Sequence, residues 1–94
     1  MNFNEYQEKA QETCLPSAQN LYYLALKLGA EAGEVQQKIA KAIRDAGLEP
    51  GKEEGSACFT DLRQEIYHEL GDVLWYVAVL AEYFFWDLES IALG

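Results

Sequence analysis

The chain has 94 residues, half of them hydrophobic and only two of them proline, which is the make-up of one globular domain and excludes a disordered or collagen-like chain. Its formal net charge of −9 opposes binding to nucleic acid polymers and to anionic membrane surfaces, so we expect neither as a partner. A domain this short leaves much of its surface uncovered, which favours assembly with further copies of itself.

The sequence carries no signal for membrane insertion or export. The longest strongly apolar stretch, residues 73–85, is interrupted by Glu82 and is shorter than the ~20 residues that a spanning helix needs. The N-terminal residues lack the cationic start and apolar centre of a signal peptide. Cys14 and Cys58 are isolated, without the spacing of a disulfide framework or a zinc site. We therefore expect a cytoplasmic protein with reduced thiols.

Proline and glycine divide the first half of the chain into predicted elements. A short helix over residues 3–13 should end before Pro16. Ser17 is a suitable N-cap for a long helix over residues 18–46, in which leucine, valine and isoleucine recur at steps of three, four and seven. The glycine-rich residues 47–55 then form a linker.

A second long helix follows the linker. Thr60 or Asp61 can cap its start, and its surface is apolar nearly all round, which indicates burial on more than one side. Asp87 should cap a last short helix that ends at Leu93. The sequence thus predicts one all-α domain over residues 1–94, an antiparallel helical bundle of two long and two or three short helices that is completed by oligomerisation.

Both long helices carry the same acidic motif. It reads acid-x-Gly-acid-Val at residues 31–35 and again at residues 69–73. Acids three positions apart on a helix point in similar directions, and both pairs lie on the same flank of the apolar stripe. The glycine in each motif would let the two backbones approach closely. Packing the helices through their stripes should bring four carboxylates together: Glu31, Glu34, Glu69 and Asp72.

Such a carboxylate cluster calls for a cation. Carboxylates a few Å apart repel unless they are neutralised, and hard divalent ions are the usual partners of oxygen-only sites. His68 projects away from the stripe, so zinc and di-iron fit less well than Mg²⁺, for which Mn²⁺ is a possible substitute. A single pair of acids would be an ordinary solvated helix face, but the repetition favours a metal site.

Mg²⁺ is often completed by substrate phosphates, so the site could accept a polyanion. Lys38 lies one turn after Glu34 on the same flank and could meet a phosphate oxygen. Tyr76 lies on the flank of Glu69 and Asp72, so its ring could line the site and contact a bound ligand.

Together these motifs resemble the MazG-like nucleotide pyrophosphohydrolases, an all-α superfamily with ExxE on one helix and ExxD on the next. The resemblance is to the small single-domain phage and bacterial members, and it runs from residues 4–13 through residues 28–35 to residues 69–77. It implies an enzyme that cleaves nucleoside triphosphates between the α and β phosphates, which releases the monophosphate and pyrophosphate. Its role would be the removal of non-standard nucleotides or the control of nucleotide pools.

The resemblance also implies roles for single residues. The four motif acids would bind Mg²⁺, with Glu65 as a possible extra ligand, and Lys38 would lie near the triphosphate. Glu34 or its neighbour Glu31 would orient the attacking water. The protein would work as a homo-oligomer, a dimer or a dimer of dimers, with the wide apolar face of the second long helix buried between subunits.

A second hypothesis comes from another class of protein. Family members usually continue past the last short helix with an asparagine and a basic segment that closes over the phosphates, whereas this sequence ends at Gly94. The alternative is therefore a non-catalytic helical oligomerisation or regulatory protein that retains the metal site.

Overall fold

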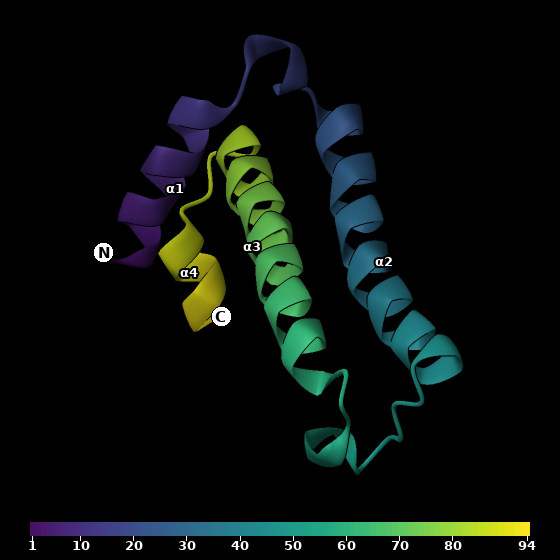
Figure 1. Ribbon diagram of the computed structural model, residues 1–94. Helices are drawn as coiled ribbons and strands as arrows, with labels where there is room; N and C mark the ends of the chain where they lie inside the picture. The colour runs from purple at the N-terminus through teal and green to yellow at the C-terminus, as the bar shows by residue number, and fades with distance from the viewer.

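The computed structural model describes all 94 residues and contains helices but no strand. α3 is the central helix; α2 runs antiparallel along one side of it, while α1 and α4 cover the other (Figure 1). The all-α fold with two long and two short α-helices confirms the prediction. The elements are α1 (Phe3–Thr13), a 3₁₀ helix (Pro16–Ala18), α2 (Leu21–Asp45), a second 3₁₀ helix (Glu53–Gly55), α3 (Phe59–Tyr83) and α4 (Leu88–Leu93).

The start of α2 differs from the sequence prediction by three residues. Ser17 lies inside the 3₁₀ helix and does not cap α2. Asn20 takes that role, because its side-chain oxygen accepts a hydrogen bond of 2.8 Å from the backbone N–H of Tyr23. The extra turn lets the chain change direction between α1 and α2 before the long helix begins (Figure 1).

The start of α3 also differs, whereas α4 begins as predicted. Thr60 and Asp61 lie within the first turn of α3 and cap nothing, and Cys58 at the N-cap position makes no side-chain capping bond. Asp87 caps α4 by accepting a 2.7 Å hydrogen bond from the backbone N–H of Ser90.

The core lies where the N-terminal part of α2 meets the other three helices. Its members are small or medium apolar side chains from all four α-helices: Ala10, Cys14, Leu24, Ala78, Val79 and Leu88. Partly buried aromatic side chains, Tyr6 and Trp75 among them, pack around this cluster. This end of the bundle fixes the position of α3 relative to α2, and therefore the position of the two acidic motifs.

A buried amide fastens α1 to the opposite end of the chain. The side-chain nitrogen of Gln7 donates hydrogen bonds to the carbonyl oxygens of Ala78 (3.3 Å) and Trp86 (2.9 Å). Its side-chain oxygen accepts a 3.0 Å bond from the backbone N–H of Leu88. One residue of α1 thus satisfies three backbone groups around the turn between α3 and α4.

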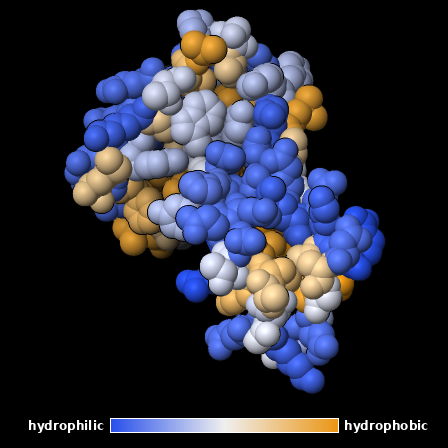
Figure 2. Space-filling model, in the orientation of Figure 1, coloured by the Kyte–Doolittle hydropathy of each residue, from blue (hydrophilic) through white to orange (hydrophobic).

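The other end of the α2 and α3 pair is open. Ile39 and Ile43 of α2 face Tyr67 and Leu70 of α3 across an apolar groove of about 490 Å³. Apolar side chains gather below the hydrophilic middle of the paired helices (Figure 2). None of the helices combines the length and the apolar character needed to cross a membrane.

Candidate functional site

Three carboxylates meet in the middle of the α2 and α3 pair. Glu31 of α2 and Glu69 and Asp72 of α3 each place one carboxylate oxygen within 4.8 Å of the others. The antiparallel packing of the two helices sets the two acidic motifs against each other. Glu31 is buried, Glu69 is half-buried and Asp72 is exposed, so the cluster reaches from the protein interior to its surface.

The fourth acid of the repeated motif lies apart from this cluster. The side chain of Glu34 is exposed and is not among the three whose oxygens converge. Because Glu34 is turned about 60° from Glu31 on the helix, it falls at the edge of the face that α2 presents to α3. Glu65 is exposed as well and also lies outside the cluster. Their roles as ligands stay predictions.

The motif glycines do not bring the two backbones together within this chain. A methyl group added at Gly33 or at Gly71 would meet no other atom within 4 Å. The close approach that the sequence suggested is therefore absent from the single chain, because both glycines face open space.

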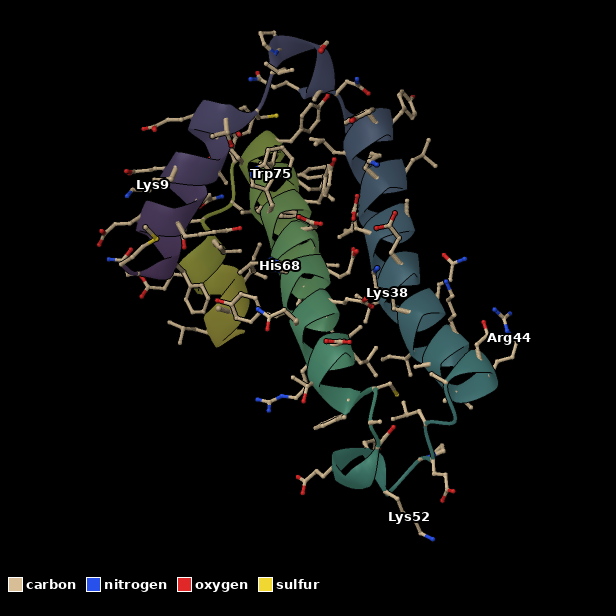
Figure 3. All side chains as sticks on the ribbon, in the orientation of Figure 1. Lys9, Lys38, Arg44, Lys52, His68 and Trp75 are labelled. Atoms are coloured by element: carbon tan, nitrogen blue, oxygen red, sulfur yellow. The ribbon has the colours of Figure 1, made fainter.

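Two lysines of α2 form ion pairs with the cluster. The Lys38 ammonium lies 3.7 Å from Glu69 Oε1 and points from α2 toward α3 (Figure 3). The Lys27 ammonium lies 3.4 Å from Glu31 Oε1. Sequence reasoning singled out Lys38 but missed Lys27, although the signal was present: Lys27 precedes Glu31 by four residues, just as Lys38 follows Glu34 by four.

One oxygen of the cluster has no partner at all. Glu69 Oε2 is buried and makes no hydrogen bond. Buried carboxylate oxygens are normally paired, and a hard divalent cation is one means of pairing them. The donors here are carboxylate oxygens only, since His68 is exposed and no cysteine joins the group. This donor set and the unpartnered oxygen fit Mg²⁺ or Mn²⁺.

Tyr76 of α3 borders the cluster. Burial raises the pKa of Tyr76 to about 12, assisted by its hydrogen bond with Tyr23 and by the negative charges of Glu31 and Asp72. The Lys27 ammonium lies 6.0 Å from the centre of the Tyr76 ring. Tyr76 therefore stays protonated at neutral pH, with its hydroxyl bonded to Tyr23 and its aromatic ring beside the carboxylates.

Further aromatic side chains surround Tyr76. Trp75 packs edge-on against it with ring centres 4.8 Å apart, and the Trp75 indole N–H donates to the Thr13 hydroxyl at 3.1 Å. Tyr6 of α1 lies near enough to Asp72 for that charge to add to burial in raising the pKa of the phenol. The cluster is therefore flanked by aromatic residues toward the core and by Lys38 toward the open end.

Two antiparallel helices of this all-α bundle contribute acidic residues to one centre. A comparison with known protein families gives a match that is consistent with this arrangement. Residues 19–92 match the MazG nucleotide pyrophosphohydrolase domain, a match that includes both acidic motifs, and the chain belongs to this family. The family consists of hydrolases that act on nucleotides and generally depend on a metal, which confirms the resemblance found in the sequence.

A phage protein is similar over most of its length. The Gene 37 protein of Mycobacterium phage L5 is 33% identical over 88 residues, which cover 86% of this chain and 70% of the phage protein. No solved structure matches the chain.

Proposed function

We propose that this protein is a Mg²⁺-dependent nucleoside triphosphate pyrophosphohydrolase. It adds water across the bond between the α and β phosphates of a ribo- or deoxyribonucleoside triphosphate, which gives the monophosphate and pyrophosphate. The observation that carries the proposal is the cluster of Glu31, Glu69 and Asp72, with its buried and unpartnered Glu69 oxygen, in a chain of the MazG family. Since nucleoside triphosphates are cytoplasmic metabolites, the protein would act in the cytoplasm, in house-cleaning or pool control.

The residues around the cluster have distinct tasks in this reaction. Glu31, Glu69 and Asp72 hold the metal, which when bound neutralises their charge and polarises the phosphoryl oxygens. Glu34 is exposed and outside the cluster, so its carboxylate is free to orient the attacking water and to take its proton. Glu31 is the second choice for that role.

Substrate contacts fall on the two sides of the cluster. Lys38 supplies an ammonium for the phosphate oxygens. Tyr76, whose hydroxyl is bonded to Tyr23, offers its ring to the nucleobase or sugar. The aromatic side toward the core would then take the nucleoside, while the triphosphate would extend over the carboxylates.

The shape of the single chain supports assembly into a dimer or a dimer of dimers. Its accessible surface is 6785 Å², whereas a compact monomer of 10.6 kDa exposes about 5,500 Å². Its radius of gyration is 15.9 Å, against about 12 Å for a compact domain of this length. The large accessible surface and the large radius of gyration are both expected for a chain whose apolar face on α3 is covered by another subunit.

The direct test is a panel of ribo- and deoxyribonucleoside triphosphates incubated with the protein, with Mg²⁺ or with chelator. We expect monophosphate and pyrophosphate in equal amounts, only with Mg²⁺, and no release from the Glu34→Gln variant. Phosphorus NMR in ¹⁸O-labelled water would identify the phosphorus atom that receives the water oxygen. Mg²⁺ binding without release from any triphosphate would contradict the proposal and favour a non-catalytic oligomerisation or regulatory protein, which the exposed apolar groove would also suit.

A further inference from the structure

The carboxylate cluster already has cations of its own. Lys27 pairs with the buried Glu31, and Lys38 pairs with the half-buried Glu69, at 3.4 Å and 3.7 Å. Both lysine side chains keep more than a third of their surface exposed, whereas the two glutamate side chains are only 11% and 14% exposed. The two glutamate side chains are thus largely enclosed by the protein. The two ammonium groups lie at the solvent-exposed edge of the site, where they can turn away from the carboxylates.

The placement of the two lysines along α2 is symmetrical about the acids. Lys27 and Lys38 are 11 residues apart, which is three helical turns, so they project from the same face of α2. Glu31 lies one turn inside Lys27, and Glu34 lies one turn inside Lys38. Each end of the acidic stretch therefore carries one ammonium group.

The charges nearly balance without any metal. Three carboxylates converge and two ammonium groups pair with them, which leaves one negative charge, on Asp72, without an ion pair. A divalent cation that binds the three carboxylates must compete with both lysines. Once displaced, the two ammonium groups stand beside the cluster without partners, and a triphosphate offers oxygens that suit them.

We propose that Lys27 and Lys38 are exchangeable internal counter-ions: they pair with Glu31 and Glu69 in the metal-free protein and turn to the phosphate oxygens when a divalent cation takes those carboxylates. The phosphate half of this inference rests on the proposed function, whereas the counter-ion half concerns the protein and the metal alone. Lys27 thereby joins Lys38 as a phosphate contact, and each ligand should strengthen the binding of the other.

The counter-ion half is tested with Mg²⁺ alone. Calorimetric titration, without nucleotide, compares wild type with Lys27→Met, Lys38→Met and Lys41→Met, after circular dichroism has established that each is helical. Lys41 is exposed, lies on the same helix and makes no ion pair, so its replacement changes the net charge equally and serves as the control. We expect Mg²⁺ to bind about 3- to 10-fold more tightly to the Lys27 and Lys38 variants than to the control. Lys27→Arg, which keeps the charge, should bind Mg²⁺ as wild type does.

Equal Mg²⁺ affinity in all three methionine variants would overturn the counter-ion role, since only the overall charge would then matter. The phosphate half is tested with an α,β-imido triphosphate analogue in saturating Mg²⁺. Lys27→Met should bind it about tenfold more weakly than Lys41→Met, and equal binding would overturn that half. A protein that gives the predicted Mg²⁺ pattern but releases no pyrophosphate would retain the counter-ion role and lose the proposed function.

Discussion

The three carboxylates of the cluster differ in what balances their charge. Glu31 and Glu69 have lysine partners, but Asp72 is exposed and has none. Replacing Asp72 by asparagine removes the unbalanced charge at nearly constant shape. We expect the metal-free protein to be as stable as wild type or more stable by about 0.5 kcal/mol, because like-charge repulsion is relieved. Mg²⁺ affinity should fall at least about tenfold, because one of three charged ligands is lost. Urea unfolding in chelator and calorimetry with Mg²⁺ measure the two effects.

Glu34→Gln is the matched comparison for Asp72→Asn. It also removes one exposed charge from an acidic motif, but from outside the converging group. It should abolish turnover while lowering Mg²⁺ affinity less than Asp72→Asn does. If Asp72→Asn instead destabilised the metal-free protein by more than about 1 kcal/mol, that acid would be structural and not a ligand held ready for metal.

Tyr76 makes stability depend on pH in the alkaline range. Its pKa is raised from 10.0 to about 12 in the folded protein, so above pH 10 the unfolded chain loses this proton before the folded chain does. The stabilisation is fully present below pH 10 and is lost as the pH rises toward about 12. We expect the free energy of unfolding to fall across this window, and urea unfolding at successive pH values measures the fall.

Tyr76→Phe should flatten that decline, because the phenol whose pKa is raised to about 12 is then absent. Tyr22→Phe is the control, since Tyr22 lies in α2 and is 80% exposed. An identical alkaline decline in wild type and Tyr76→Phe would show that the Tyr76 hydroxyl is not held in the buried, acid-lined environment described above.

At the level of the elements, Gln7 holds α1 against the turn between α3 and α4. Gln7→Ala would leave the carbonyl of Trp86 and the N–H of Leu88 without these partners and would remove a second, buried bond to the Ala78 carbonyl, which lies within α3. We expect a loss of about 2–3 kcal/mol, seen as a lower urea midpoint with an unchanged slope. Asn4→Ala is the control, because Asn4 makes one exposed bond across the same helices, to Glu89 N–H, and should cost under about 1 kcal/mol. Equal losses in the two variants would contradict the fastening role of Gln7.

The sequence was sufficient to predict the four α-helices, but not the first turns of the two long ones, α2 and α3. The position of Pro16 predicted where α1 ends, its predicted range of residues 3–13 matches the structure, and Asp87 caps α4 as predicted. Ser17 and Asn20 are both good capping residues, so composition alone could not rank them. In the structure Ser17 is part of the 3₁₀ helix at Pro16–Ala18, which leaves Asn20 as the N-cap of α2.

The candidate site was also predictable only in part: the sequence identified the acidic residues, but not which of them converge. The helical period placed the motif acids on one flank, and three of them converge in the structure. Acids three positions apart differ by about 60° in direction, so the exact rotation of α2 against α3 determines whether Glu34 also points inward. That rotation is a property of tertiary packing. The role of Lys27 depends on the same rotation, because it pairs with an acid that only the folded chain buries.

At the scale of the whole molecule, polar and apolar surfaces are separated along the α2 and α3 pair. Hydrophilic side chains cover the middle of the pair and apolar side chains gather below them (Figure 2), at the end where the groove lies. Tyr67 and Leu70 are 75% and 54% exposed there. Exposed apolar surface of this kind often marks an interaction surface, so we expect another copy of this small chain to cover the groove.

We expect Leu70→Lys to break the assembly, because it places a charge in the groove that another subunit would cover. Its effect on the single chain should be small, since the Leu70 side chain is already more than half exposed. Light scattering coupled to size exclusion should give a multiple of 10.6 kDa for wild type and 10.6 kDa for the variant. Leu15→Lys, at a 68% exposed position between α1 and α2, is the control and should keep the wild-type mass. A wild-type protein of 10.6 kDa at all concentrations would contradict assembly through the groove.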